Sequence, residues 1–253
     1  MKLADTHTHL FLDEFDSDCE QVIQRAINAG VEKMILPNVD SGTIQRLFNT
    51  YELAPSNCFP AIGLHPCSVK ANYKEELDIH EKILKQHQFV AIGEVGIDLY
   101  WDKTFFKEQI IALEKQIEWA IQYNLPVILH CRDSFDKLYE IVSRYKNLKG
   151  VFHAFIGNIG QAKKVIGLGF YLGIGGVVTF KNSGLDKVIE NINLEHIVLE
   201  TDSPYLTPVP YRGKRNESAY ITFIADKIAG ITNIDVKIVA DITTKNAVNL
   251  FKI

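Results

Sequence analysis

Short apolar runs alternate with reactive polar side chains along the whole chain of 253 residues. Eight runs stand out, and each is continuous rather than alternating, as is typical of strands in a parallel sheet covered on both faces. They occupy residues 3–4, 34–36, 61–64, 90–93, 127–129, 151–152, 170–174 and 197–199. Histidine, glutamate or aspartate follows most of them. This pattern predicts one polar site at one end of the sheet.

The segments between these runs have helical periodicity. In residues 105–123, apolar side chains recur every three or four positions, at Phe106, Ile110, Leu113, Ile117 and Ile121. Strands that alternate with helices form parallel sheets, and eight such units in a chain of this length match an α/β fold of the (β/α)8 TIM-barrel type. We therefore expect a single domain over residues 1–253. The alternative, a doubly wound open sheet, gathers ligand groups at a switch point between two strands, whereas here they follow at least six.

Composition favours a globular domain, since 47% of the residues are hydrophobic and 23% are charged. The net charge of -4 argues against a broad, nonspecific polynucleotide surface but allows a small basic cleft. No run approaches the roughly 20 apolar residues of a membrane span, and residues 1–5 have the pattern of a strand rather than of a signal peptide. We expect a cytoplasmic protein with no membrane partner. Its four cysteines, at positions 19, 58, 67 and 131, are expected to be reduced.

His7 and His9 form a His-x-His pair after the first run. The period of two in a strand sends both imidazoles to the same face, close enough to bind one metal ion. The alternative is a pair of ordinary polar residues where the strand leaves the barrel. Against this, five of the eight histidines follow predicted strands, at positions 7, 9, 65, 130 and 153.

Glu94, His130 and His153 also follow buried runs. An unpaired carboxylate in such a position is costly, and a cation removes the difficulty. The two oxygens of Glu94 could bridge two ions. The alternatives are a buried salt bridge to lysine or arginine for Glu94, and satisfied core positions for the histidines. Taken together, the three residues predict a second metal site.

Asp202 follows the last run, and the eighth strand of a closed barrel neighbours the first. This placement brings Asp202 beside His7 and His9. Glu200 lies two residues earlier and therefore shares the same face. It either orients a ligand histidine or pairs with a lysine inside the barrel.

Several motifs in this order resemble those of the TatD-type metal-dependent deoxyribonucleases, a family of the amidohydrolase-like metal-dependent hydrolase superfamily. The similar segments are residues 5–9 (DTHTH), 63–66 (GLHP), 91–98 (AIGEVGID), 126–132 (PVILHCR), 199–206 (LETDSPYL), 212–217 (RGKRNE) and 243–247 (TTKNA). Two segments depart from the family pattern. Residues 153–157 read HAFIG where HCFSG is usual, and residues 216–218 read NES where NEP is usual.

The resemblance implies a hydrolase with two divalent ions, of Mg, Mn, Zn or Co. It implies that one ion is held by His7, His9, Glu94 and Asp202, and the other by Glu94, His130 and His153. Two such ions suit phosphodiester hydrolysis. Asp202 is the candidate general base, and His65 is a candidate hydrogen-bond donor to the phosphate or leaving group. The alternative for His65 is a capping role before Pro66.

Polar and cationic residues after the eighth run are candidate contacts to substrate phosphate, namely Arg212, Lys214, Arg215 and Asn216. Arg132 is a further candidate, and Tyr100 and Trp101 could stack on a nucleobase. The alternative for these positions is solvated or packed loop structure. The three remaining histidines, His80, His87 and His196, are expected to have structural roles only.

Three functions remain open. The resemblance favours a deoxyribonuclease of the 3′ to 5′ exonuclease type, acting on single-stranded DNA or 3′ ends without an obligate protein partner. The second is a hydrolase of an ester or aminoacyl linkage on the same fold, similar to a D-aminoacyl-tRNA deacylase. The third is a non-catalytic metal-binding protein, which gives no reason for a ligand set that leaves room for water.

Overall fold

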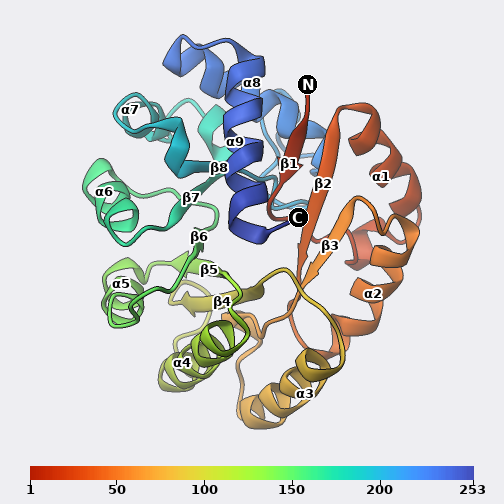
Figure 1. Ribbon diagram of the computed structural model, residues 1–253, viewed down its shortest axis with the longest axis vertical. Coiled ribbons are helices and arrows are strands. Elements are labelled where there is room, and N and C mark those ends of the chain that lie inside the picture. Colours follow the sequence, from red (N-terminus) through yellow and green to blue (C-terminus); the bar gives the residue numbers. More distant parts are fainter.

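The computed structural model describes residues 1–253 and contains eight parallel strands. Figure 1 shows them surrounded by helices. The strands are β1 (Leu3–Asp5), β2 (Val31–Pro37), β3 (Cys58–Ala61), β4 (Ile92–Asp98), β5 (Val127–Arg132), β6 (Gly150–Phe152), β7 (Tyr171–Ile174) and β8 (Ile197–Leu199). Each of the eight predicted runs therefore lies on or beside a strand.

The strands close into a barrel. Two ladders, β1-β2-β3 and β4-β5-β6-β7-β8, are joined by single bridges between Ile62 and Ile92 and between Thr8 and Ser203. The second junction is reinforced because the backbone N–H of Thr6 donates to the carbonyl of Leu199 at 3.0 Å. Closure brings the first and last strands together and confirms the TIM-barrel prediction over the open-sheet alternative.

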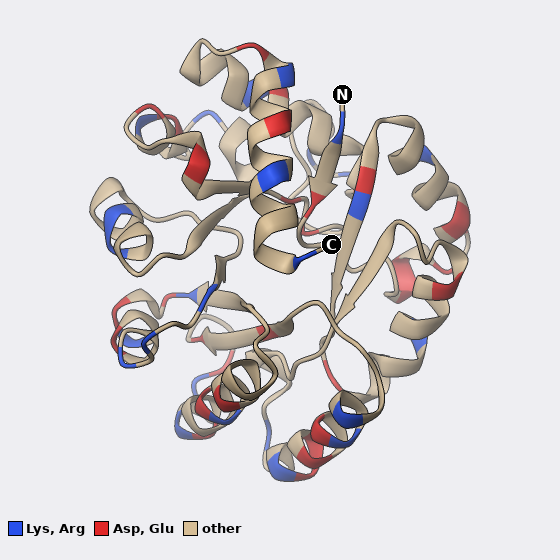
Figure 2. Cartoon of the chain, in the orientation of Figure 1, with Lys and Arg blue, Asp and Glu red and all other residues tan.

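Nine α-helices accompany the strands, and most of the charged residues lie on these helices and on loops (Figure 2). Amphipathic sequences explain this arrangement, because one face of each helix packs on the barrel while the other meets solvent. The helices are α1 (Cys19–Asn28), α2 (Ile44–Leu53), α3 (Tyr73–Gln86), α4 (Phe106–Tyr123), α5 (Phe135–Val142), α6 (Ile159–Gly167), α7 (Leu185–Ile189), α8 (Ile221–Thr232) and α9 (Val236–Phe251). None is long and apolar enough to cross a membrane.

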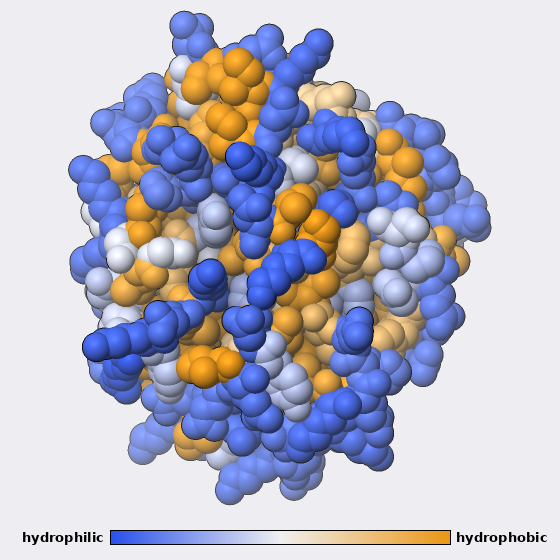
Figure 3. All heavy atoms as spheres, viewed as in Figure 1, coloured by the Kyte–Doolittle hydropathy of each residue, from blue (hydrophilic) through white to orange (hydrophobic).

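Helix α9 crosses one end of the barrel instead of joining the outer ring (Figure 1). Three of its residues pack on an apolar layer inside the barrel, formed by Ala4, Ile35, Ala61, Ala91, Ile128, Val151 and Val198 with Ala247, Leu250 and Phe251 of the helix. The side-chain amide of Asn246 also donates to the carbonyls of Leu194 and Ile197, at the start of β8. This face mixes hydrophilic and apolar residues (Figure 3). The helix thus covers the amino ends of the strands.

Strand periodicity places the polar residues one layer above this apolar layer. His130 lies two residues after Ile128, His153 two residues after Val151, and Glu200 two residues after Val198. Because residues two apart share a face, these side chains point into the barrel at its carboxyl end. Glu94 and His130 lie within β4 and β5, whereas the sequence indicated that they follow them. The strands continue past these residues, since Asp98 pairs with Arg132 in register.

A substitution at Gly150 would test how tightly the barrel is packed. A Cβ atom there would lie 2.3 Å from the carbonyl oxygen of Val127, whereas one at Gly230 in α8 would meet nothing within 4 Å. We expect Gly150→Ala to lower the free energy of unfolding by about 1–3 kcal/mol through overpacking. Gly230→Ala should raise it by up to about 1 kcal/mol through helix propensity. Urea unfolding measures both, and equal midpoints would contradict the packing argument.

Candidate metal centre

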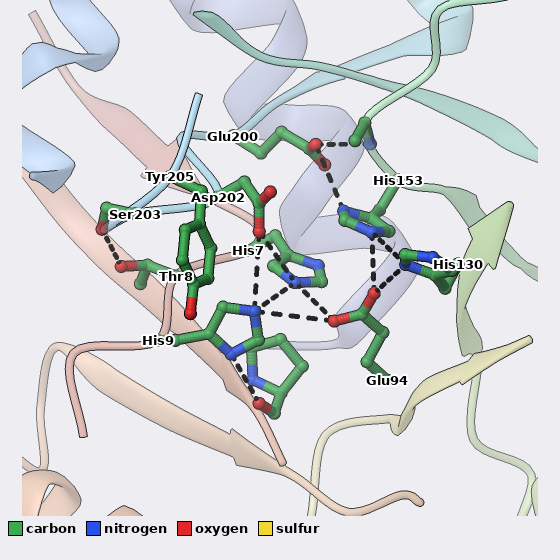
Figure 4. Close-up of polar contacts among 12 residues, drawn as sticks. His7, Thr8, His9, Glu94, His130, His153, Glu200, Asp202, Ser203 and Tyr205 are labelled. Carbon is green, nitrogen blue, oxygen red and sulfur yellow. Dashed lines mark hydrogen bonds and ion pairs between the residues drawn. The ribbon is translucent and has the colours of Figure 1, made fainter. Parts of the chain in front are cut away.

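The carboxylate of Glu94 is the centre of a ring of histidines (Figure 4). Glu94 is only 2% exposed, and its two oxygens face different groups. Oε2 lies 3.1 Å from Nε2 of His7 and 3.5 Å from Nε2 of His9. Oε1 lies 2.7 Å from Nδ1 of His130 and 2.8 Å from Nε2 of His153. One carboxylate therefore divides the centre into two halves.

Asp202 completes the half that contains His7 and His9. Its Oδ1 lies 3.6 Å from Nε2 of His7 and 3.5 Å from Nε2 of His9. The backbone N–H of Asp202 also donates to the carbonyl of His7 at 2.8 Å, which fixes the loop after β8 against the residues after β1. The structure thus brings together all six of the expected ligands.

The donor atoms fit divalent ions. Nε2 of His7 and Nε2 of His9 are 3.0 Å apart, and both face the same carboxylate oxygen. Two nitrogens bound about 2.1 Å from one ion lie roughly 3.0–3.4 Å apart. The five ion pairs of Glu94 are all with histidines, so the alternative of a salt bridge to lysine or arginine is wrong. A set of imidazole and carboxylate ligands suits Zn²⁺, Mn²⁺ or Co²⁺.

Electrostatics also favour positive charge at this point. Burial alone would raise the pKa of Glu94, but the imidazoles of His153, His65 and His7 outweigh it and hold that pKa well below its ordinary value. Burial lowers the pKa of His7, which keeps its imidazole neutral and able to bind metal. Burial also opposes protonation of His153, yet Glu94 and Glu200 raise its pKa well above the ordinary value. The site therefore combines anionic carboxylates with a strong local preference for a cation.

Acceptors on the far side of three imidazoles orient the rings, two through hydrogen bonds and one through an ion pair. Nδ1 of His9 faces the carbonyl of Pro37 at 3.2 Å, and Nε2 of His130 faces Oδ2 of Asp98 at 2.9 Å. Nδ1 of His153 lies 3.5 Å from Oε1 of Glu200. Each acceptor favours a proton on the outer nitrogen. The inner nitrogen is therefore the one that would give up its proton to bind a metal ion.

His65 has the opposite arrangement. Its Nδ1 accepts a hydrogen bond from the backbone N–H of Cys67 at 3.0 Å, which caps the turn Pro66–Ser68. A neutral ring that accepts at Nδ1 carries its proton at Nε2. Nε2 of His65 lies 3.2 Å from Oε1 of Glu94 and therefore donates toward the centre. The capping role and the donor role, which the sequence left as alternatives, are both consistent with the structure.

The chain is similar to known proteins over almost its whole length. The family described as TatD related DNase matches residues 4–252. The chain belongs to the TatD family. It is 37% identical to the uncharacterized metal-dependent hydrolase YabD of Bacillus subtilis, over 99% of each chain. It is 33% identical to the uncharacterized metal-dependent hydrolase YjjV of Escherichia coli, over 85% of this chain and 84% of that one.

Solved structures agree with this assignment. The crystal structure of the TatD homologue YjjV from Escherichia coli superposes with a TM-score of 0.93 at 30% identity, over 99% of this chain and 98% of that one. A TatD-family hydrolase from Entamoeba histolytica shares the fold, with a TM-score of 0.83 at 23% identity over 99% and 98% of the two chains. The protein is a metal-dependent hydrolase of the TatD family.

Asp98 lies beside the candidate metal centre, and the sequence analysis assigned it no role. Its Oδ2 accepts from Nε2 of His130, while its Oδ1 accepts from the backbone N–H groups of Tyr100 and Trp101, both at 2.9 Å. One carboxylate thus orients a candidate ligand and shapes the loop after β4. The signal was the spacing of Glu94 and Asp98, because residues four apart in a strand share a face.

Glu200 supports His153 from deeper in the barrel. It is fully buried, and its Oε1 accepts from the backbone N–H of Ala154 at 2.5 Å besides facing Nδ1 of His153. A Cβ atom at Gly173 would lie 2.2 Å from the other oxygen of Glu200, so only glycine fits beside this carboxylate. No lysine pairs with Glu200. The structure therefore favours the orienting role over the lysine-paired one.

The loop after β8 differs from expectation at Asn216. This residue is fully buried, and its side-chain amide donates to the carbonyls of Thr201 and Tyr205. Its side-chain oxygen accepts from the backbone N–H of Glu217. Because both polar atoms of its side chain are bonded inside the protein, Asn216 braces the loop, and the predicted contact with substrate is wrong.

The cations of this loop divide into two kinds. Arg215 makes two hydrogen bonds of 2.7 Å to Asp18 and one of 2.6 Å to the carbonyl of Glu14, so it fastens the loop to the start of α1. Arg212 and Lys214 are exposed and form no ion pair; Arg212 lies 4.1 Å from the ring centroid of Phe180. Arg132 lies 4.6 Å from the ring centroid of Tyr100. Arg212, Lys214 and Arg132 have no charged partner and remain candidates for a ligand, whereas Arg215 is engaged within the protein.

The remaining histidines have the structural roles expected. His80 is buried and bonds the carbonyl of Glu76 at 2.6 Å and the side chain of Asn38 at 2.9 Å. His87 packs against the ring of Phe48. His196 ends the short turn before β8. None of the three lies in the groups of side chains able to hold a metal.

Metal binding should stabilise the fold through Glu94. At an ion concentration of about 100 times Kd, the gain is about 2.7 kcal/mol, or roughly 5–10 °C in Tm. We expect this shift with Mn²⁺ or Zn²⁺ in the unaltered protein, and its loss in Glu94→Gln, which removes the negative charge shared by both halves. Calorimetric melting of the apo and metal-loaded proteins measures it. The exposed Glu190 provides the control, since Glu190→Gln should keep the full shift.

Asp98→Asn should weaken metal binding without disturbing the loop. The asparagine oxygen can still accept from Tyr100 and Trp101, but its amide group can donate to His130 and favour the tautomer with a proton on the inner nitrogen. Affinity for one ion should fall on the order of 10–100-fold. Titration calorimetry on the apoprotein measures this, with the exposed Asp226→Asn as control. Equal affinities in the two variants would contradict the orienting role.

Proposed function

We propose that this TatD-family hydrolase is a deoxyribonuclease that removes nucleotides from the 3′ ends of single-stranded DNA. The observation that carries the proposal is the division of the site by Glu94, whose two oxygens face His7 and His9 on one side and His130 and His153 on the other. His7, His9, Glu94 and Asp202 would hold one divalent ion and Glu94, His130 and His153 a second, and such ions when bound would supply Lewis acidity for phosphodiester hydrolysis. The protein contributes the ligands, a proton acceptor and hydrogen-bond donors.

Asp202 is the proposed proton acceptor. Burial would raise its pKa, but hydrogen bonding to His9 and the nearby imidazoles lower it below the ordinary value, so the carboxylate is ionised at neutral pH. Its side chain is 14% exposed, against 2% for Glu94, which leaves it open to water. An ionised carboxylate at the solvent side of the site can accept a proton from the attacking water.

His65 is the proposed donor to the substrate. The hydrogen bond from Cys67 holds its proton on Nε2, so the ring offers a fixed N–H and no lone pair to the centre. A preorganised donor of this kind stabilises negative charge on a phosphoryl or leaving oxygen. Arg212 and Lys214, exposed on the loop after β8, are the proposed contacts to the DNA backbone.

A labelled single-stranded oligonucleotide tests the proposal. With Mg²⁺ or Mn²⁺ the protein should release mononucleotides from the 3′ end, and Glu94→Gln or Asp202→Asn should reduce the rate by a factor of roughly 10³ or more. His65→Ala should reduce kcat roughly 10²-fold with unchanged metal content, because it removes a donor and not a ligand. His65→Gln, which keeps an N–H, should recover part of the loss.

Two results would overturn the proposal. Full activity in excess chelator would show that bound metal is not required. Hydrolysis of an aminoacyl ester by the same preparation, with DNA left intact, would assign the site to ester substrates. The Glu94→Gln protein, purified identically, controls for contaminating nucleases.

A further inference from the structure

A cavity of about 490 Å³ adjoins the metal centre on its outer side. It lies at the carboxyl ends of β4, β5 and β6, where α5 and α6 begin (Figure 1). Its wall includes Leu99, Cys131 and Ala154, each the next residue after Asp98, His130 and His153. In β5, where successive side chains point to opposite faces, His130 faces the centre and Cys131 faces the cavity. Leu99 and Ala154 line the cavity from the residues just after β4 and β6. His153 lines the cavity as well and forms the common wall.

Half of the residues that line the cavity are apolar, and three of these are aromatic. Phe135, Phe152 and Phe155 contribute rings, and Phe152 and Phe155 are almost completely buried. Ile156 stands at the rim with 52% of its surface exposed. Its exposed apolar surface extends the buried rings of Phe152 and Phe155 to the mouth of the cavity. Ile156 also lies in the segment 153–157, where the sequence departs from the family pattern.

The charges around the cavity favour a neutral occupant over a phosphate group. Asp133 and Asp136 line it and are exposed. Lys137 is the one lining cation, and its Nζ lies 2.9 Å from Oε2 of Glu140, which neutralises it. A phosphate would meet two carboxylates with no free positive charge. A neutral ring with N–H groups could donate hydrogen bonds to the same carboxylates. Its faces could pack against the apolar side chains of the walls.

We propose that this cavity, called here the base pocket, binds the nucleobase of a nucleoside that flanks the scissile phosphate. The proposal rests on the nuclease function proposed above. The volume falls within the range of about 300–1,000 Å³ typical of small-molecule sites. Phosphate at the metal centre and a base across the His153 wall correspond to the two ends of one nucleotide. The pocket thus holds the substrate nucleotide by its base while the centre engages its phosphate.

Oligonucleotides that lack one base test this assignment. An abasic residue at the terminal or penultimate 3′ position keeps the scissile phosphate but removes the ring. When the base is missing at the position that the pocket binds, kcat/KM should fall on the order of tenfold. A loss of this size is typical when one base no longer stacks on aromatic side chains. Ile156→Ser should lower kcat/KM about fivefold on the intact oligonucleotide and have no effect on the abasic one, because both changes remove the same contact.

Ile238→Ser is the matched control. Ile238 is 50% exposed on α9, at the opposite end of the barrel, so the same substitution should leave both substrates unaffected. Equal cleavage of intact and abasic oligonucleotides overturns the base pocket and leaves the nuclease function standing. Additive effects of Ile156→Ser and base removal overturn it as well. Absence of cleavage in every arm overturns the nuclease function itself.

Binding of the reaction product tests the base pocket without any need for catalysis. Deoxyadenosine 5′-monophosphate should bind the metal-loaded protein about tenfold more tightly than deoxyribose 5-phosphate does, by titration calorimetry. Ile156→Ser should reduce this advantage, and Ile238→Ser should preserve it. Equal affinities for the two compounds overturn the pocket. Inorganic phosphate binding that Ile156→Ser weakens would overturn it too, because the cavity would then hold an anion.

Discussion

The structure depends on the burial of one carboxylate, that of Glu94, within a closed barrel. An isolated buried anion is strongly unfavourable, and the cost is offset only by compensating charge and hydrogen bonds. Here the compensation comes from histidines of several strand ends, each within 3.5 Å of the carboxylate. The barrel therefore brings distant parts of the chain to one point, where their histidines compensate the charge of Glu94. A divalent ion satisfies the same requirement more completely than imidazoles alone.

Two features of the fold make that arrangement possible. Helix α9 covers the amino end of the barrel and completes its apolar layer, which leaves the carboxyl end for polar groups. The junction between β1 and β8 brings Asp202 to His7 and His9, although nearly two hundred residues separate them. Around the ligands, Asp98 and Glu200 hold the outer nitrogens of His130 and His153, so ring orientation is set before any ion binds. The site is preorganised by groups that face away from it.

The sequence predicted much of this site because its signals are local. A continuous apolar run followed by histidine or a carboxylate indicates a buried strand and the polar residue at its end, and His130 and His153 follow that rule. Asn216 shows where local signals fail. Its amide looks available in the sequence, but three backbone groups of its own loop bind it. Arg215 is similar, since Asp18, nearly two hundred residues earlier, engages its guanidinium.

By itself, the sequence determined the alternation of strands and helices and the residue types available to the site, because the period of two and the period of 3.6 are properties of short segments. Only the tertiary structure decided the protonation of each imidazole. His9 and His65 have the same side chain, yet Pro37 leaves one with a lone pair for metal and Cys67 leaves the other with a proton to donate. The fold supplies those partners from neighbouring strands and turns, and hydrogen bonds place protons according to distance and direction in space.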